Sequence, residues 1–247
     1  PILHVVIFPN FYNFEENLKT YLHIMSKVIK IKKGLDISLT GAPEKEVTEL
    51  PKAQYVAVKP TDFPGLTPKI KAKAGMEVKA GTPLFYDKYN PEIVFTSPVS
   101  GKVFAINRGE RRRILEFVIE NDNKEEFESF KQAKPEDLSR EEIKENILNS
   151  GCWPLIRQRP FNIIADKNEV PRDIFITSFS SAPLAPNFDL IVKDEFSTFQ
   201  TGINALKKLT DGKIYLGIKA GELSTPFTNT ANVEKFEFKG PHPAGNT

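Results

Sequence analysis

Two glycine-supported corners constrain the fold of this chain more than any other feature. Gly75 and Gly81 bracket a tight loop in the stretch AGMEVKAGTPLFYDK, and Val78 and Leu84 are its apolar anchors. The later stretch PVSGKVFAINRGERRRILEFVIE offers turn, strand, turn and strand again. Glycine permits the backbone conformations that sharp corners need, and small β-barrels and sandwiches depend on such corners. The two halves form a quasi-repeat, which predicts a flattened barrel of two interlocking sheets.

The hairpin between these halves carries a lysine with two interpretations. Lys88 lies ahead of the turn Pro98-Val99-Ser100-Gly101, and lipoyl and biotinyl carrier domains present their modified lysine in this way. The interval from Lys88 to Pro98 is longer than in a carrier domain, however, and Pro91 stiffens the tip. We therefore interpret Lys88 as a solvated surface residue, with a cofactor-attachment lysine as the alternative.

A change of composition separates this β-rich part from the second half. The stretch NDNKEEFESFKQAKPEDLSREE is dense in charge and has no strand pattern. Ser139 and Glu142 then have the spacing of a capping box, and Gly151 stands where a left-handed C-terminal residue belongs, so a helix is predicted between them. Strand and helix patterns alternate after Gly151. This alternation predicts an α/β domain with a partly parallel sheet.

These patterns divide the chain into four parts. Residues 1–26 are predicted to be a non-native or disordered N-terminal extension, because a strand pattern directly follows Met25-Ser26 and residues 1–24 would then precede the reading frame. Residues 27–122 form the β domain, 123–138 the linker and 139–247 the α/β domain. The chain stops just after a strand pattern, so we expect further domains to follow it in a longer protein.

Composition and motifs exclude several classes of function. A net charge of +2 gives no global attraction to nucleic acid, and no apolar run approaches the roughly 20 residues that span a bilayer as a helix. One cysteine, Cys152, cannot supply a disulfide or a thiolate metal cluster, and the three histidines are widely separated. The sequence contains no G-x-G-x-x-G, Walker or G-x-S-x-G motif. We therefore expect no metal, no nucleotide bound through a standard loop and no nucleophilic catalysis by this chain alone.

The stretch SGCWPLIRQRPF, residues 150–161, is the main candidate for a ligand site. It places Trp153, Arg157, Arg159 and Phe161 at the start of the α/β domain, and ligands often bind at strand ends in such sheets. A quinone or flavin ring could stack on an aromatic side chain while an arginine holds a carbonyl or carboxylate. The alternative is a loop that its prolines fix and whose arginines form salt bridges.

A second basic feature is the run Arg111-Arg112-Arg113, which follows Gly109 and Glu110. Such a run could bind an acidic surface of a partner. The alternative is a charged turn between two strands.

Taken together, the chain resembles the A subunit of the sodium-translocating NADH:quinone reductase over most of residues 27–245. The same order of segments carries the resemblance, which is more specific than any one motif. These segments are KIKKGLDISLTGAP, KAGMEVKAGTPLFYDKYNPEIVFTSPVSGKVFAINRGERR, SGCWPLIRQRPF, ITSFSSAPLAPN and FKGPHPAG.

The resemblance implies both a fold and a role. The first domain would be a barrel-sandwich module of the biotinyl/lipoyl type, and the second a Rossmann-like α/β domain like that of the flavin subunit of complex I. The protein would be a peripheral subunit on the cytoplasmic face of a bacterial inner membrane, bound to membrane subunits. The complex would oxidise NADH, reduce ubiquinone and export sodium ions. This subunit would contribute to quinone binding and assembly, without a catalytic residue of its own.

One departure from the flavin-carrying relatives bears on cofactors. Those relatives open the Rossmann-like domain with a glycine-rich loop that cradles the FMN phosphate, whereas SGCWPLIRQRPF has one glycine and two prolines. Proline lacks the backbone donor that an anion nest needs. We therefore expect no bound FMN and no other bound cofactor, and take ubiquinone or menaquinone as the ligand of Trp153, Arg157, Arg159 and Phe161. A carrier with lipoylated or biotinylated Lys88 and a ligand-free scaffold remain the alternatives.

Overall fold

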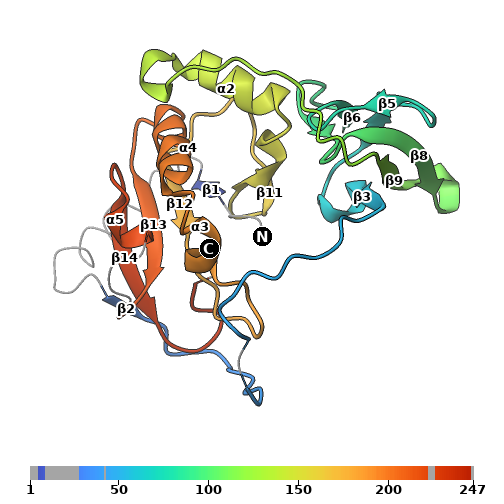
Figure 1. Cartoon of the computed structure of the whole chain (residues 1–247). Coiled ribbons are helices and arrows are strands. Elements are labelled where there is room, and N and C mark those ends of the chain that lie inside the picture. The colour runs from blue at the N-terminus through green and yellow to red at the C-terminus, as the bar shows by residue number, and fades with distance from the viewer. Residues whose placement is uncertain (1–4, 9–27, 42, 222–225, 246–247) are drawn as a thin grey trace.

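A computed structural model describes residues 5–8, 28–41, 43–221 and 226–245 of the chain. These residues form a small all-β part, called here the β unit, and a mixed part, called the α/β unit (Figure 1). The β unit lies on the right of Figure 1, the α/β unit on the left, and helix α2 (Arg140–Asn149) runs across the top of the α/β unit. The fold is therefore α+β with two structural units, as the sequence predicts.

Two sheets build the β unit. The four-stranded sheet has the order β3-β9-β8-β5 and the three-stranded sheet the order β4-β6-β7. Their strands are β3 (Tyr55–Val58), β4 (Pro68–Ile70), β5 (Glu77–Val78), β6 (Pro83–Asp87), β7 (Val94–Thr96), β8 (Gly101–Arg108) and β9 (Ile114–Asn121). All the pairings within them are antiparallel. The expected barrel-sandwich of two sheets is confirmed.

Three phenylalanine rings hold the two sheets of the β unit together. The ring of Phe85 on β6 stacks on Phe95 of β7 at 4.6 Å between centroids and on Phe117 of β9 at 4.9 Å. Phe85 and Phe117 are fully buried. Stacked aromatic pairs at this separation stabilise a core beyond the area that they bury. Because Phe117 belongs to the four-stranded sheet and Phe85 to the three-stranded one, this stack is the centre of the barrel core.

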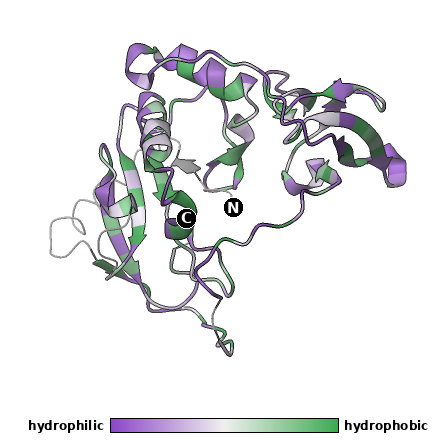
Figure 2. Ribbon diagram, viewed as in Figure 1, coloured by the Kyte–Doolittle hydropathy of each residue, from purple (hydrophilic) through white to green (hydrophobic). Residues whose placement is uncertain are grey.

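The α/β unit is built on a seven-stranded sheet with the order β11-β10-β1-β12-β13-β14-β2. Its strands are β1 (Val5–Phe8), β2 (Val28–Lys30), β10 (Ile156–Gln158), β11 (Ile163–Ile164), β12 (Asp173–Thr177), β13 (Ile214–Lys219) and β14 (Glu234–Lys239). Strands β12, β13, β14 and β2 are parallel neighbours. Helices α3 (Phe188–Val192) and α4 (Phe196–Lys208) connect β12 to β13, and α5 (Pro226–Asn229) precedes β14. Figure 2 shows hydrophobic residues concentrated in the central strands β12 and β13.

Strands β1 and β2 depart from the domain division expected from the sequence. The sequence predicts that residues 5–8 lie in an extension outside the fold, but β1 pairs with β10 on one side and β12 on the other. Strand β2, expected to open the β domain, pairs with β14 at the edge of the seven-stranded sheet. Both strands are short, and their partners lie far along the chain, so no local pattern reveals the pairing. Residues 9–27, including Met25, lie outside the described residues, and the boundaries at 122 and 139 stay predictions.

Helix α2 begins with the capping box that the sequence predicts. The backbone N–H of Ser139 donates to Glu142 Oε2 at 2.9 Å, and the Glu142 N–H donates to Ser139 Oγ at 3.3 Å. At the other end Gly151 has φ +75°, and its N–H donates to the Leu148 carbonyl at 3.1 Å. These bonds satisfy backbone groups that a helix leaves unpaired at its ends. The linker before α2 also contacts α4, through Asn204 Nδ2 and Glu136 Oε1 at 2.8 Å.

The capping carboxylate gives a pH-dependent contribution to stability. Hydrogen bonds from Lys131 and from Ser139 lower the pKa of Glu142 to about 2. A carboxylate with a lowered pKa stabilises the fold above its unfolded pKa, and this contribution disappears as the pH falls through the folded value. We expect Glu142→Gln to be less stable than the parent at pH 7, and the difference to vanish between about pH 4.5 and pH 2. Urea midpoints at several pH values measure it.

Glu141→Gln is the matched control, because Glu141 lies in the same first turn of α2. It shares the interaction with the helix dipole but has no part in the capping box. An equal, pH-independent loss in both variants would contradict the role assigned to Glu142.

Candidate functional site

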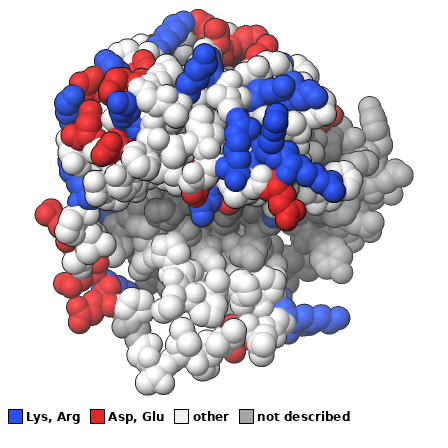
Figure 3. Space-filling view, turned by 90° about the vertical axis from the view of Figure 1, so that its right-hand side faces the viewer, with Lys and Arg blue, Asp and Glu red and all other residues white. Residues whose placement is uncertain are grey.

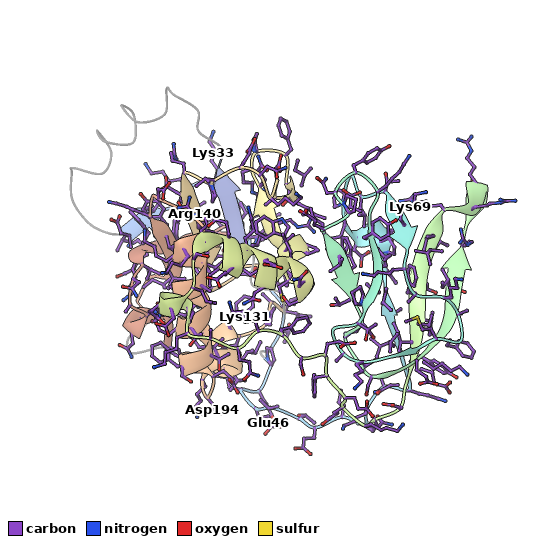
Figure 4. All side chains as sticks on the ribbon, turned by 90° about the horizontal axis from the view of Figure 1, so that it is seen from above. Lys33, Glu46, Lys69, Lys131, Arg140 and Asp194 are labelled. Carbon is purple, nitrogen blue, oxygen red and sulfur yellow. The ribbon has the colours of Figure 1, made fainter. Side chains whose placement is uncertain are left out.

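The stretch 150–161 lies where the α/β unit meets the β unit. Thr96 on β7 donates to the Ser150 carbonyl at 3.4 Å, and a Cβ on Gly151 would lie 2.5 Å from Thr96 Oγ1. Glu92 of the β unit forms an ion pair with Lys167 of the α/β unit at 2.5 Å. Figure 4 shows the two units side by side from above. A close approach and an ion pair therefore fix the start of the α/β unit against the β unit.

Trp153 occupies a core position. It lies in the short 3-10 helix Trp153–Leu155, is 4% exposed, and its Nε1 donates to the Ala165 carbonyl at 2.8 Å. A buried indole with its one donor satisfied has no face for a planar ligand. This burial speaks against ring stacking on Trp153, because the tight turn before β10 directs the indole into the core. We therefore leave Trp153 out of the site proposed below.

Arg157 extends from the sheet toward the β unit. It lies on β10, which is flanked by β1 and β11, and its guanidinium carbon is 5.2 Å from the centroid of the Phe63 ring. Its Nη1 is buried and has no hydrogen-bond partner among the described residues. Burial lowers the pKa of Arg157 from its ordinary value. The cation–π contact with Phe63 offsets part of the free-energy cost of burying the guanidinium, but Nη1 still donates to no described acceptor.

Arg159, two residues after Arg157, also has a buried nitrogen without a hydrogen-bond partner among the described residues. This nitrogen is its Nε, and the peptide bond from Arg159 to Pro160 is cis. Phe161, which follows, is 78% exposed. In the part of the chain that the structure describes, neither arginine forms an ion pair. The salt-bridged alternative is therefore not found there.

The candidate site thus contains two arginine side chains, each with one buried nitrogen that lacks a hydrogen-bond partner, and an aromatic ring exposed to solvent. Buried donors without partners are uncommon in proteins, and each is costly unless a ligand or water satisfies it. A guanidinium can donate to a ring carbonyl while an aromatic face contacts the ring itself. Phe63 belongs to the same junction, although sequence reasoning missed it. In the sequence, Phe63 is simply an aromatic residue in a loop of the β unit. The packing of the two units brings its ring to Arg157.

Lys88 is an exposed residue of the loop between β6 and β7. Its N–H donates to the Thr67 carbonyl at 2.8 Å, and its Nζ lies 5.1 Å from the centroid of the Tyr89 ring. Asp87 and Asn90 are joined through their side chains at 3.0 Å and tighten the loop. This placement fits a solvated surface lysine, and no described contact favours the carrier alternative.

Within the described ranges, no group of three or more His, Cys, Asp or Glu side chains could hold a metal ion. No helix among those residues is both long and apolar enough to cross a membrane.

Comparison with known proteins shows the family. The model of the NqrA N-terminal barrel-sandwich hybrid domain matches residues 29–122, and that of the NqrA second alpha/beta domain matches residues 138–247. The A subunit of the Na(+)-translocating NADH-quinone reductase from Tolumonas auensis is 42% identical over 221 residues, and that from Photorhabdus laumondii is 40% identical over 220. The corresponding protein from Neisseria meningitidis serogroup B is 41% identical over 220 residues.

Each of these alignments covers 88% of this chain and 49% of the relative, so the chain spans about half the length of the curated relatives it matches. Both family models match consecutive parts of the chain, in the order of its β and α/β units. The chain therefore belongs to the family of NqrA, the A subunit of the Na(+)-translocating NADH-quinone reductases.

Proposed function

We propose that this chain is part of a peripheral subunit of a Na⁺-translocating NADH:quinone reductase and contributes to quinone binding and assembly of the complex. NADH oxidation and the redox cofactors would belong to other subunits. Family membership supports the role in the complex, because the relatives are named as its A subunit. The observation that supports quinone binding is the pair of buried arginine nitrogens without described partners, in a segment that continues to the exposed Phe161.

The proposed contacts follow from the chemistry of a quinone head group. Its two carbonyl oxygens are acceptors without charge, and its ring is flat and apolar. Arg157 Nη1 and Arg159 Nε each have a buried donor to offer, while Phe161 offers a ring face. Ubiquinone or menaquinone would bind with its carbonyls toward the arginines, and the site would hold rather than chemically transform it. Arg157, Arg159 and Phe161 are kept in the proposed site, and Trp153 is not.

The proposal also covers the location of the protein and its cofactors. The protein would lie on the cytoplasmic face of a bacterial inner membrane and dock on membrane subunits. It would bind no FMN, since Pro154 and Pro160 occupy the segment where flavin-carrying relatives have a glycine-rich loop. Pro154 is buried in the 3-10 helix with Trp153, so this loop is filled by its own side chains.

A substitution that removes a charge without removing volume tests the site. Arg157→Met deletes a buried donor that has no described partner, so it is expected to leave the melting temperature unchanged or to raise it. The same change should weaken binding of a soluble quinone analogue about tenfold or more, because a hydrogen bond from a charged group is worth about 1.5–3 kcal/mol. Equilibrium titration and a thermal melt of the same sample measure both effects.

Arg140→Met is the contrasting control. Arg140 donates to the Lys208 carbonyl at 2.8 Å and pairs with Asp211, so its loss should lower the melting temperature and leave quinone affinity unchanged. Unchanged quinone affinity in Arg157→Met, in Arg159→Met and in Phe161→Ala would overturn the proposed site.

A further inference from the structure

The β unit carries an open groove that adjoins the junction site at one residue, Phe63. It has a volume of about 720 Å³, which is within the range of clefts that bind ligands. The loop before β4, the whole of β4 and the end of the β8–β9 hairpin form its walls. Phe63, Pro68, Lys69 and Ile70 line it from the side of β4, and residues of the β8–β9 hairpin line it from the other side. Phe63 is the one residue that the groove shares with the junction, where Arg157 lies over its ring.

All the charged residues that line the groove are basic. Lys69, Arg108, Arg112 and Arg113 contribute cations, and none of the lining residues is a carboxylate. Among the described residues none of these four forms an ion pair. Figure 3 shows Lys and Arg side chains gathered on the face of the β unit that it presents, and Figure 4 shows Lys69 beside the β8–β9 hairpin. The groove therefore favours a negatively charged occupant.

The hairpin tip that carries the arginines has an unusual backbone. Arg111 and Arg112 both have positive φ, at 52° and 59°. Residues other than glycine rarely adopt this conformation, but a two-residue turn that joins the strands of a hairpin requires it at both central positions. Arg108 Nη1 donates to the Arg112 carbonyl at 3.2 Å and holds the tip in this shape. The run of arginines is thus a fixed turn, and two of its three side chains line the groove.

One wall of the groove is the free edge of a sheet. Strand β4 pairs with β6 on one side and has no partner strand on the other among the described residues. The side chains of neighbouring strand residues point to opposite faces of the sheet, yet Pro68, Lys69 and Ile70 all line the groove. A groove that touches all three must run along the edge of the strand rather than over one face.

The register shows which backbone groups that edge offers. Lys88 N–H donates to the Thr67 carbonyl and Lys71 N–H to the Leu84 carbonyl, so Thr67 and Lys71 are hydrogen-bonded positions toward β6. In an antiparallel pair these positions alternate. The carbonyls of Pro68 and Ile70 and the N–H of Ile70 therefore point away from β6. Pro68 supplies no donor, which limits unselective pairing at this edge.

We propose that this groove binds an extended acidic segment of a partner protein, which adds as a strand to the free edge of β4. The backbone of the segment would bond to Ile70 and to the Pro68 carbonyl, while its carboxylates would meet the four cations of the groove. A free phosphate or a lipid head group would use the cations, but would leave the edge of β4 unused. That another subunit of the complex supplies the segment rests on the proposed function.

The charge part of the proposal is tested with a fluorescent peptide of alternating glutamate and valine and the purified chain. We expect binding that weakens with added salt and that falls about tenfold or more in Lys69→Glu/Arg113→Glu. Lys73→Glu is the matched control, since Lys73 is an exposed lysine of the same unit outside the groove. A peptide of alternating glutamine and valine should not bind. Equal affinity of the parent, the double variant and the control for the acidic peptide would overturn the proposal.

The strand part is tested with two N-methylated forms of the acidic peptide. One carries methyl groups on its odd residues and the other on its even residues, so that each blocks one backbone edge of the peptide. Strand addition predicts that one form binds and the other does not, whereas equal binding of both forms contradicts it. Inorganic phosphate, and vesicles of equal parts phosphatidylcholine and phosphatidylglycerol, should displace the peptide only at concentrations that act through ionic strength. Stoichiometric displacement by either would assign the groove to that ligand instead.

These measurements need no quinone, and Phe63 is left unchanged. A failed peptide titration would therefore leave the quinone proposal standing, and loss of quinone binding in Arg157→Met would leave the groove proposal standing.

Discussion

Replacing Gly101 by alanine is expected to unfold the β unit. Gly101 begins β8 with φ +144°, and a Cβ there would lie 1.9 Å from the Glu120 carbonyl oxygen. This oxygen belongs to the paired strand β9, so it cannot move without breaking the ladder in which Gly101 faces Asn121. We expect a loss of more than about 4 kcal/mol in the free energy of unfolding, at the upper end of single substitutions.

Gly75→Ala is the control that separates the clash of an added Cβ from the cost of a backbone with positive φ. Gly75 also has positive φ, at +86°, but no atom lies within 4 Å of the position that its Cβ would take. Only the left-handed backbone is penalised there, which costs about 1–2 kcal/mol. Hydrogen exchange of the β8 and β9 amides reports on the β unit, and the fluorescence of Trp153 reports on the α/β unit. Equal losses in the two variants would show that the contact with Glu120 is not the cause.

Phe85→Ala is expected to cost about 3–5 kcal/mol, the range for removing a large aromatic side chain from a core. Phe85 is fully buried and stacks on both Phe95 and Phe117. Its removal leaves a cavity at the point where the two sheets meet, so neither sheet can close it without shifting against the other. We expect an earlier urea transition of the β unit and faster hydrogen exchange on both sheets.

Phe104→Ala is the control for the size of the residue. Phe104 lies on β8 of the same unit but is 58% exposed, and its ring contacts Tyr55 at 5.0 Å between centroids. Its loss should cost less than about 1 kcal/mol. If Phe104→Ala were as destabilising as Phe85→Ala, the core would not be centred on the Phe85 stack.

Features encoded by neighbouring residues could be predicted from the sequence. The glycine-bracketed loop between Gly75 and Gly81, the capping box at Ser139 and the left-handed Gly151 all follow from residue types at fixed short spacing. The β-rich first part and the alternating second part follow from periodicity in the same way. In each case the interaction joins residues close in the chain, so the local pattern contains both partners.

The site was only partly predictable for the opposite reason. A loop that contains tryptophan and two arginines gives no sign of which side chains are buried, since burial depends on the residues that pack against it. Trp153 proved to be a core residue, whereas Arg157 proved to extend across the junction to Phe63. The arginine run was predicted either to bind an acidic surface or to form a charged turn, but its groove depends on β4, which lies far from it in sequence.

Residue types and their spacing were therefore enough to predict the glycine-bracketed loop, the helix caps, the succession of a β part and an α/β part, and the resemblance to NqrA. The pairing of β1 and β2, the arginine nitrogens without described partners and the basic groove along the edge of β4 emerge only from the folded structure. They do so because strand pairing and burial join segments that are distant in the chain. A short strand or a single arginine carries no local record of the partner that the fold will bring to it.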